Sequence, residues 1–283
     1  MSGEDRLTSL AAFTTERPLL LVGCGRMGGA LLKGWIGAGI NPAAVLVVDP
    51  AAADGNAAPQ GVRVVDAVAR LAPDLAPRMI VLAVKPQVMD DAVAGLKPFT
   101  DRGAAVLSIA AGKSLAYFKG AFGAETPVIR AMPNTPAAIG KGITAAVANA
   151  QTDDATRQLG ELLLGTVGAF VWLDEEKHMD AVTAVSGSGP AYVFYLTECL
   201  ASAGAAAGLP PELSHTLALH TVVGAGALLA EGDRAPDELR EAVTSPAGTT
   251  AAALDVLMSE KGLSALMRKA VAAAAKRSRE LSR

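Results

Sequence analysis

Residues 18–28, PLLLVGCGRMG, join an apolar run to three closely spaced glycines. The run Pro18–Val22 has the composition of a buried strand, and Met27–Ile40 has the apolar spacing of a helix. Glycines between a strand and a helix permit a tight turn and let the backbone approach a pyrophosphate closely. The free N–H groups at the start of the helix then attract the anion. This context predicts a dinucleotide-binding turn.

Further apolar runs follow along the first half of the chain, separated by helical patterns and turns. We predict strands at residues 44–49, 78–84, 104–109, 127–130, 143–148 and 170–173. Nearly continuous apolar strands that alternate with helices are typical of a parallel sheet covered on both faces. After about Asp174 no convincing strand follows. Helices are predicted there at residues 174–186, 190–207, 211–230, 236–244, 249–260 and 263–281.

These patterns predict an α/β protein with two domains. A Rossmann-like, doubly wound and mostly parallel sheet is expected over residues 18–174, after a flexible leader at 1–17. An all-helical dimerisation and substrate domain is expected over 175–283. Several of its helices are apolar over most of their circumference, and such helices need cover on every side. We therefore expect self-association into a homodimer or a larger ring of dimers.

The bulk composition argues against several other classes of protein. The chain of 283 residues has a net charge of −3 and no Lys/Arg tract, so we expect no nucleic-acid partner. Residues 1–17 lack the apolar core of a signal peptide, and 215–230 is interrupted by His and Gly, so we expect a buried helix there and no membrane partner. Cys24 and Cys199 form no motif, which favours a reducing compartment, the cytoplasm. The three histidines lack metal-ligand spacing, so no metal is expected.

Asp49 ends the second predicted strand, 21 residues after Gly28. An acid at this place typically accepts hydrogen bonds from the adenosine ribose and repels a 2′-phosphate, which favours NADH. Arg26 offsets this by offering a cation in the same region. Asp49 is alternatively a turn residue before Pro50. The choice between NADH and NADPH stays open, with a lean to NADH.

Three unusual loops follow predicted parallel strands, at Lys85–Pro86, Ala110–Gly112 and Met132–Pro136. Ligands of open α/β sheets bind outside the carboxyl ends of the strands, so these loops are expected to shape a pocket. We assign Asn134, in the third loop, to the cofactor. Ordinary turn chemistry is the alternative for each loop taken singly.

Two further motifs lie between predicted helices of the second half. Ser186–Pro190, SGSGP, ends one helix and begins the next, and we assign Ser188 to the substrate. Ser245–Thr250, SPAGTT, offers hydroxyls and free N–H groups before a helix, which is a good cradle for a carboxylate. The alternatives are a plain interhelical turn and a helix cap made by Thr249 or Thr250.

In order along the chain, GCGRMGGALLKG, AVKP, IAAG, IRAMPNTPA, AVSGSGPAYVF and SPAGTT resemble the pyrroline-5-carboxylate reductase family. The likeness extends over about residues 18–281, and the last two motifs are its specific part. It implies a Rossmann domain and an interleaved helical dimer. It also implies that NADPH or NADH is held by Gly23, Cys24, Gly25, Arg26, Met27, Gly28, Ala83, Val84, Lys85, Pro86, Ile109, Ala110 and Ala111.

The resemblance implies the substrate side as well. Ser245–Thr250, with Gly248 and Thr249, would hold the carboxylate and ring nitrogen of Δ1-pyrroline-5-carboxylate, with Thr250 as the prime candidate for catalysis. Asp233 matches an acidic position where Glu is commoner in the family. The family's glycine loop has Asn where this chain has Arg26, and many members have a small polar residue where it has Asp49. Both departures bear on cofactor choice.

The implied reaction is hydride transfer to the imine carbon, giving L-proline, the last step of proline biosynthesis. A cyclic imine needs no strong acid when Thr250 or a water that it orders donates the proton. A β-hydroxyacid dehydrogenase is one alternative. Such an enzyme would require a catalytic Lys early in the helical half, and residues 190–230 contain no Lys. A non-catalytic dinucleotide-sensing protein is the other.

Overall fold

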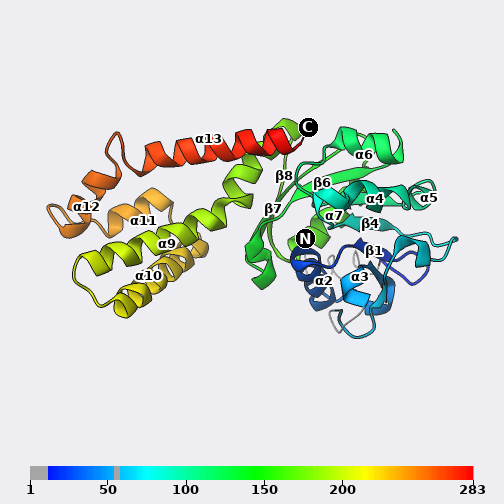
Figure 1. The fold of residues 1–283 in the computed structure, drawn as a ribbon, viewed down its shortest axis with the longest axis horizontal. Coiled ribbons are helices and arrows are strands. Elements are labelled where there is room, and N and C mark those ends of the chain that lie inside the picture. Colours follow the sequence, from blue (N-terminus) through cyan, green and yellow to red (C-terminus); the bar gives the residue numbers. More distant parts are fainter. Residues whose placement is uncertain (1–11, 54–57, 283) are drawn as a thin grey trace. The chain divides into compact units, whose positions relative to one another are not determined.

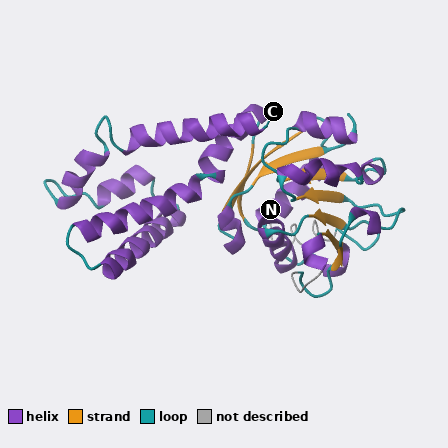
Figure 2. Ribbon diagram, in the orientation of Figure 1, coloured by secondary structure: helices purple, strands orange, loops and turns teal. Residues whose placement is uncertain are grey.

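The computed structural model describes residues 12–53 and 58–282, and the chain divides into two compact units. Unit 1 comprises Met1–Gly187 and Ala275–Arg283, and unit 2 comprises Ser188–Ala274. The predicted fold class is confirmed, because unit 1 contains a mainly parallel sheet and unit 2 is helical (Figures 1 and 2). The division lies later than the predicted boundary at Asp174, and the end of the chain groups with the sheet.

The described residues of unit 1 form an eight-stranded sheet in the order β3-β2-β1-β4-β5-β6-β7-β8. Its strands are β1 (Leu19–Val22), β2 (Val45–Val48), β3 (Arg63–Val65), β4 (Met79–Leu82), β5 (Ala105–Ser108), β6 (Val128–Met132), β7 (Gly142–Ala148) and β8 (Gly168–Trp172). Neighbours from β3 to β6 are parallel, so the carboxyl ends of β1, β4, β5 and β6 share one edge. Ligands of such sheets bind at this edge.

Two features of the sheet differ from the expectation. The edge strand β3 was not predicted, because its three residues include only two apolar side chains. Strand β7 runs antiparallel to β6. Residues 133–141 connect these two strands and are fewer than the dozen or so that a parallel crossover requires.

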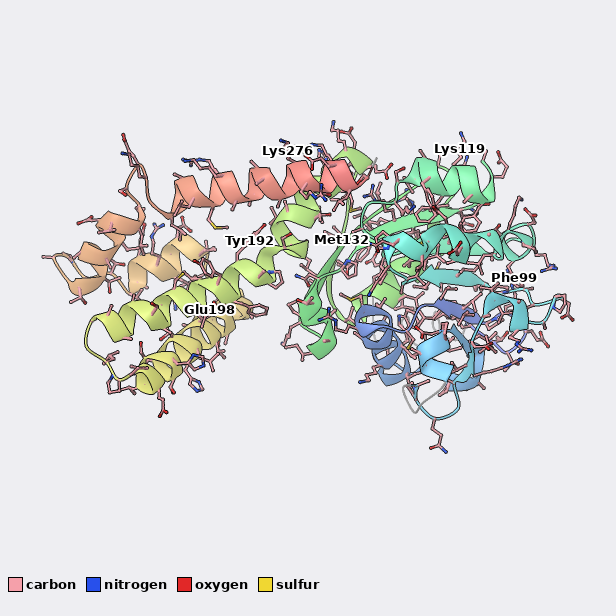
Figure 3. All side chains as sticks on the ribbon, in the orientation of Figure 1. Phe99, Lys119, Met132, Tyr192, Glu198 and Lys276 are labelled. Atoms are coloured by element: carbon pink, nitrogen blue, oxygen red, sulfur yellow. The ribbon has the colours of Figure 1, made fainter. Side chains whose placement is uncertain are left out.

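Side chains alternate across the central strands and bury both faces of the sheet. Leu19 and Leu21 contribute to one core with α2 (Arg26–Gly37) and α7 (Asp154–Gly165). Leu20 contributes to the other core, which α4 (Met89–Ala94), α5 (Lys97–Thr100) and α6 (Leu115–Phe122) cover. Figure 3 labels Phe99 of α5 in this second layer. Burial on both faces explains why the strands are apolar without alternation.

Most of the remaining segments of unit 1 are short. The helices that cover the second face are α4 (Met89–Ala94), α5 (Lys97–Thr100) and α6 (Leu115–Phe122). The other short helical segments are η1 (Pro42–Ala44), α3 (Pro50–Ala53), η2 (Val68–Arg70), η3 (Pro86–Val88), η4 (Thr135–Ile139), η5 (Glu176–His178), α8 (Met179–Val182) and the π-helix η6 (Thr183–Gly187). The predicted helix at 174–186 is therefore three consecutive short elements of different winding.

The predicted leader is described only in part, because residues 1–11 lie outside the described residues. Phe13 is 4% exposed and belongs to the core under α2. The backbone N–H of Thr14 donates to the Arg17 carbonyl, which closes a turn before β1. The packed part of the chain thus begins before Pro18, where the domain was expected to start.

Unit 2 is built on a pair of helices joined by a short turn. Its helices are α9 (Gly189–Ala206), α10 (Pro211–Glu231), α11 (Pro236–Ala242), α12 (Thr249–Leu257) and α13 (Leu263–Leu281), the last of which continues into unit 1. A Cβ on Gly204 would lie 2.2 Å from the Ser214 hydroxyl oxygen, and that hydroxyl donates to the Ala201 carbonyl at 2.6 Å. The glycine therefore lets α9 and α10 approach closely.

Large apolar side chains of unit 2 are exposed in the single chain. Only Ser214 and Ala218 of α10 are buried, so the prediction of a buried helix at 215–230 is wrong for one chain taken alone. By length and composition α10 is apolar enough to cross a membrane, with a mean hydropathy of 1.4. Figure 3 shows the side chains along α9, where Tyr192 and Glu198 are labelled, and the exposed apolar set includes Val193, Phe194, Leu196, Leu200, Leu213, Leu217, Val223 and Leu228.

Candidate active site

The turn between β1 and α2 depends on glycines that lie against neighbouring backbone. Gly23 has a φ of +94°, and a Cβ there would lie 2.8 Å from the Ala83 carbonyl carbon. A Cβ on Gly28 would lie 2.2 Å from the Gly23 carbonyl oxygen. Real Cβ atoms do not approach so closely, and L side chains rarely adopt the φ of Gly23. The turn therefore packs directly on the segment that follows β4.

The start of α2 is open to a ligand. Gly25 is the N-cap residue, and a Cβ placed on it would have no heavy atom within 4 Å. No side chain caps the helix, and its first turn carries no acidic residue. The first N–H groups of a helix have no partner within the helix and attract anions. The cradle at Gly25 therefore fits the pyrophosphate of a dinucleotide.

Asp49 links the end of β2 to this turn. Its Oδ2 accepts a hydrogen bond from the Cys24 backbone N–H at 2.6 Å. Its Oδ1 accepts from the N–H groups of Ala51 at 2.8 Å and Ala52 at 3.0 Å, at the start of α3. Asp49 is thus the turn residue that the alternative predicted, and it also braces the glycine turn. A carboxylate has about four acceptor positions, so capacity for a ribose hydroxyl remains.

The Cys24 side chain is not activated as a nucleophile. Burial raises the pKa of the Cys24 thiol, and the negative charge of Asp49 raises it further, while Lys33 acts in the opposite direction. A reactive cysteine needs its thiolate form near neutral pH. Cys24 therefore serves the turn as a small side chain with a backbone donor.

Three predicted loops meet at the carboxyl edge of the sheet. Ala83–Pro86 follows β4, Ile109–Gly112 follows β5, and the segment from Met132 follows β6. Backbone hydrogen bonds hold the first two loops to the neighbouring strands. The Ala83 N–H donates to the Val22 carbonyl at 2.8 Å, and the Ile109 N–H donates to the Leu82 carbonyl at 3.0 Å. The structure therefore brings the cofactor-side residues together, with Lys85 and Ala111 exposed.

A polar cluster joins the segments that follow β4 and β5. The Tyr117 hydroxyl donates to Asp90 Oδ1 at 2.5 Å, and Lys113 Nζ donates to the same oxygen at 3.0 Å. These hydrogen bonds, with Tyr117 first, lower the pKa of Asp90. Burial raises the pKa of Tyr117, and the bond to Asp90 raises it further. The cluster ties the start of α4 to the start of α6.

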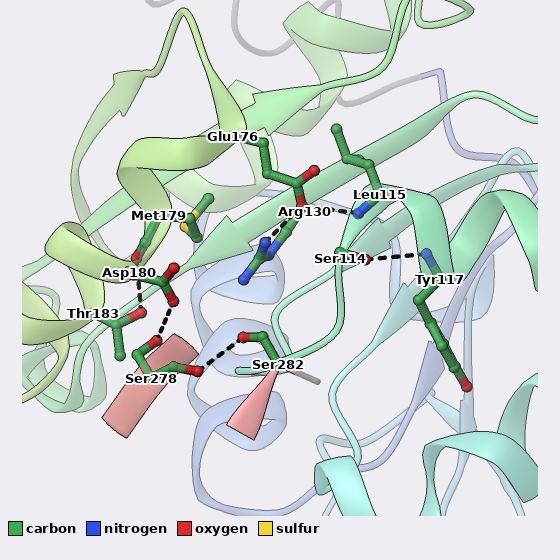
Figure 4. Close-up of polar contacts among 10 residues, drawn as sticks. All are labelled: Ser114, Leu115, Tyr117, Arg130, Glu176, Met179, Asp180, Thr183, Ser278 and Ser282. Carbon is green, nitrogen blue, oxygen red and sulfur yellow. Dashed lines mark hydrogen bonds and ion pairs between the residues drawn. The ribbon is translucent and has the colours of Figure 1, made fainter. Parts of the chain in front are cut away.

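An ion pair that was not predicted from the sequence lies at the same end of the sheet. Arg130 Nη1 lies 2.6 Å from Glu176 Oε1, and their side chains are 7% and 29% exposed. Oε1 also accepts the Leu115 N–H at 2.9 Å (Figure 4). The pair therefore connects β6, η5 and the first residue of α6. Its only signal in the sequence is a charged residue inside the apolar strand VIRAM.

The Asn134 side chain links the start of β7 to the end of η6, a contact that was not predicted from the sequence. It is 9% exposed. Its Oδ1 accepts the Ile143 N–H at 2.9 Å, and its Nδ2 donates to the Ser186 carbonyl at 3.1 Å. Both ends of the amide therefore bond to protein, and its assignment to the cofactor stays a prediction.

The SPAGTT motif of unit 2 forms a tight turn before α12. The Gly248 N–H donates to the Ser245 carbonyl at 3.1 Å, and Ala247 has a φ of +58°, which is unusual for a residue other than glycine. Gly248 is the N-cap residue, and no side chain caps the helix. Thr249 and Thr250 therefore do not serve as caps, contrary to the alternative, and their hydroxyls are available to a ligand.

The other predicted substrate residues lie at different points of unit 2. Ser188 precedes α9 as its N-cap residue and makes no capping bond with its side chain. Asp233 is exposed in the loop after α10, next to Gly232, whose φ is +75°. Among the residues that the structure describes, no cluster of His, Cys, Asp or Glu could hold a metal ion.

Comparisons with known proteins cover both units. A family model described as pyrroline-5-carboxylate reductase dimerisation matches residues 176–281. A second, described as NADP oxidoreductase coenzyme F420-dependent, matches residues 19–112. A pyrroline-5-carboxylate reductase of Pseudomonas aeruginosa is 39% identical over 265 residues, which cover 93% of this chain and 96% of that protein.

Solved structures agree with these matches. The pyrroline-5-carboxylate reductase of Coxiella burnetii has a TM-score of 0.86 at 32% identity and covers 95% of this chain and 99% of its own. The pyrroline carboxylate reductase of Plasmodium falciparum, solved with NADP bound, has a TM-score of 0.79 at 28% identity and covers 95% and 100%. The chain belongs to the pyrroline-5-carboxylate reductase family.

Proposed function

We propose that this protein reduces the ring imine of Δ1-pyrroline-5-carboxylate to L-proline, the last step of proline biosynthesis. A bound NADPH or NADH supplies the hydride. The observation that carries the proposal is the open cradle at Gly25, which lies beside the three loops at the carboxyl edge of the sheet. Membership of the family over nearly the whole chain supports the choice of substrate.

The cofactor side of the proposed site belongs to unit 1. The glycine turn and the first turn of α2 would hold the pyrophosphate on backbone N–H groups, and Asp49 would accept from the adenosine ribose. The loops after β4 and β5 would border the nicotinamide. The residues proposed to contact the cofactor are Gly23, Cys24, Gly25, Arg26, Met27, Gly28, Asp49, Ala83, Val84, Lys85, Pro86, Ile109, Ala110, Ala111 and Asn134.

Cofactor choice rests on the charges beside the ribose. The Asp49 carboxylate disfavours a 2′-phosphate, whereas the Arg26 guanidinium favours one. Asp49 is braced by three backbone N–H groups, so it cannot swing away to admit the phosphate without losing those bonds. The balance leans to NADH, while the NADP-bound relative shows that the family fold also admits NADP.

The residues proposed to bind the substrate belong to unit 2. The N–H groups at the start of α12 and the Ser245 hydroxyl would anchor the substrate carboxylate. The Thr250 hydroxyl, or a water that it orders, would donate the proton to the ring nitrogen. Anchoring fixes the imine carbon in position, which is the main contribution that a protein makes to such a reaction. Ser188, Gly248, Thr249 and Asp233 complete the proposed set.

Self-association follows from the dimerisation family model over residues 176–281. We propose that the exposed apolar side chains of α9 and α10 are covered in a homodimer, or in a ring of such dimers, and not by lipid. We also propose that the protein has no nucleic-acid partner, because its net charge is −3 and its sequence has no Lys/Arg tract. Cys24 and Cys199 are both free thiols, which supports a cytoplasmic location.

The test is oxidation of NADH and of NADPH by the purified protein in the presence of Δ1-pyrroline-5-carboxylate, followed by the loss of nicotinamide absorbance. Turnover with either cofactor supports the proposal. Cofactor binding without turnover would favour the sensing protein. Turnover of a β-hydroxyacid in place of the imine would favour the dehydrogenase alternative.

A further inference from the structure

We propose that Asn134 is a positioning residue, which holds the π-helix η6 against the carboxyl edge of the sheet and thereby sets the geometry of hydride transfer. Its kinetic consequence rests on the proposed function, and its structural part does not. The inference starts from the two hydrogen bonds of the Asn134 side chain.

The orientation of the Asn134 amide follows from its neighbours. The Ile143 backbone N–H is a donor, so the atom facing it at 2.9 Å must be Oδ1. The NH₂ group then faces the Ser186 carbonyl, to which it donates at 3.1 Å. One amide therefore joins the start of β7 to the last turn of η6, inside unit 1.

The Ser186 carbonyl needs this donor for a reason that the sequence supplies. In a regular helix it would accept from the N–H of the residue four places later. That residue is Pro190, which has no N–H. The next N–H, of Ala191, donates to the Ser188 carbonyl at 3.0 Å instead. Asn134 Nδ2 takes the place of the missing helical donor.

The hydroxyls of η6 are already engaged within the helix. Thr183 Oγ1 donates to the Met179 carbonyl at 2.9 Å, as Figure 4 shows, and Ser186 Oγ donates to the Val182 carbonyl at 3.0 Å. Such back-bonding competes with the regular helical ladder. These hydroxyls hold the wider winding of η6 from inside, and Asn134 holds the segment from outside.

Gly187 of η6 also packs against the end of β6. A Cβ on Gly187 would lie 2.7 Å from Met132 Cε, at the end of β6. Single π-turns are frequently found at functional sites. Here the π-turn is the last segment of unit 1 before Ser188, and it is pinned to the loop between β6 and β7, at the edge where the cofactor loops meet.

Asn149 provides a matched control at the opposite end of β6. Its Oδ1 accepts the Val128 N–H at 3.0 Å, and its Nδ2 donates to the Thr126 carbonyl at 2.8 Å. Its side chain thus makes the same pair of backbone bonds as Asn134, far from the carboxyl edge, and its Oδ1 also accepts from the Thr152 hydroxyl at 2.7 Å. A merely structural amide would behave alike at both positions.

The experiment compares Asn134→Ala with Asn149→Ala in the full chain. We expect both to lower the unfolding midpoint, by about 4–8 °C for the two hydrogen bonds of Asn134 and somewhat more for the three of Asn149. Only Asn134→Ala should speed amide hydrogen exchange in residues 183–189, by about fivefold. Only Asn134→Ala should lower kcat, by about 10- to 100-fold, which is more than it raises the KM for the cofactor.

A second variant isolates the bond to Ser186. Asn134→Asp keeps the acceptor toward Ile143 and replaces the donor toward Ser186 with a carboxylate oxygen that repels the Ser186 carbonyl, so its exchange and kcat effects should be at least as large as those of Asn134→Ala. Equal kcat in the Asn134 and Asn149 variants, or unchanged exchange in residues 183–189, overturns the proposal. If the natural protein itself reduces no imine, the proposed function fails, while the exchange measurement still decides whether Asn134 holds η6.

Discussion

For the ion pair of Arg130 and Glu176, we predict that the effects of two mutations on the free energy of unfolding are not additive. Glu176→Ala leaves the guanidinium, only 7% exposed, without its carboxylate partner at 2.6 Å. Removal of one member of a buried pair costs about 3–5 kcal/mol. The lower end applies because the Glu176 side chain is 29% exposed, and water reaches the carboxylate side of the pair. We therefore expect Glu176→Ala to cost about 3 kcal/mol.

The reverse change should be milder. In Arg130→Met the apolar side chain replaces most of the buried volume, and the Glu176 carboxylate can hydrate and still accept the Leu115 N–H. The loss is then a charge-assisted hydrogen bond, about 1–2 kcal/mol. The double variant leaves no buried charge. We expect it to be more stable than Glu176→Ala alone, by about 1 kcal/mol.

The assay is urea unfolding at a fixed protomer concentration, followed by tryptophan fluorescence, since Trp35 is fully buried. An exposed pair provides the control. Lys97 and Asp101 also lie 2.6 Å apart, but their side chains are 52% and 57% exposed. Asp101→Ala should cost at most about 0.5 kcal/mol. A double variant whose loss equals the sum of the single losses would refute the reasoning, because the buried charge would then carry no cost of its own.

Three further predictions address the site. Thr250→Ala should cut turnover and leave cofactor binding near normal, and an equal loss of both would remove the proposed role of its hydroxyl. Asp49→Ser should shift the ratio of kcat/KM values toward NADPH, and an unchanged ratio would mean that Asp49 only braces the turn. Tyr117→Phe should raise the pKa of Asp90 toward its ordinary value, as an NMR titration would show, because the phenol is the main cause of the lowered pKa. Since that folded-state pKa is depressed, the stabilisation that it provides is present above the unfolded pKa and is lost as the pH falls through the folded pKa. A pKa of Asp90 that is the same in the variant and in the natural protein would contradict the role of the hydrogen bond from Tyr117 to Asp90.

Local patterns predicted much of unit 1. The runs at 18–22, 44–49 and 78–84 became β1, β2 and β4, because strands buried on both faces need nearly continuous apolar residues. The glycine turn was predictable because its backbone geometry tolerates few other residues. The strand β3 was not, since three residues carry too little pattern to stand out.

The bounds of the helices of unit 2 were predicted more accurately than the burial of their side chains. The expected ranges 190–207 and 211–230 lie within a residue or so of α9 and α10, since proline and glycine mark their ends. Burial was not predictable in the same way. An apolar helix shows that cover is needed but not which surface supplies it, and α10 proves to be mostly exposed in the single chain.

The sequence alone was sufficient for the fold class, the dinucleotide turn and the edge of the sheet where the cofactor loops meet, because each follows from short-range composition. Only the tertiary structure established the pairing of Arg130 with Glu176 and the hydrogen bond of Asn134 to Ser186. These contacts join residues 46 and 52 positions apart in sequence. Their geometry is set by how strands and helices pack, and no local spacing along the chain encodes it.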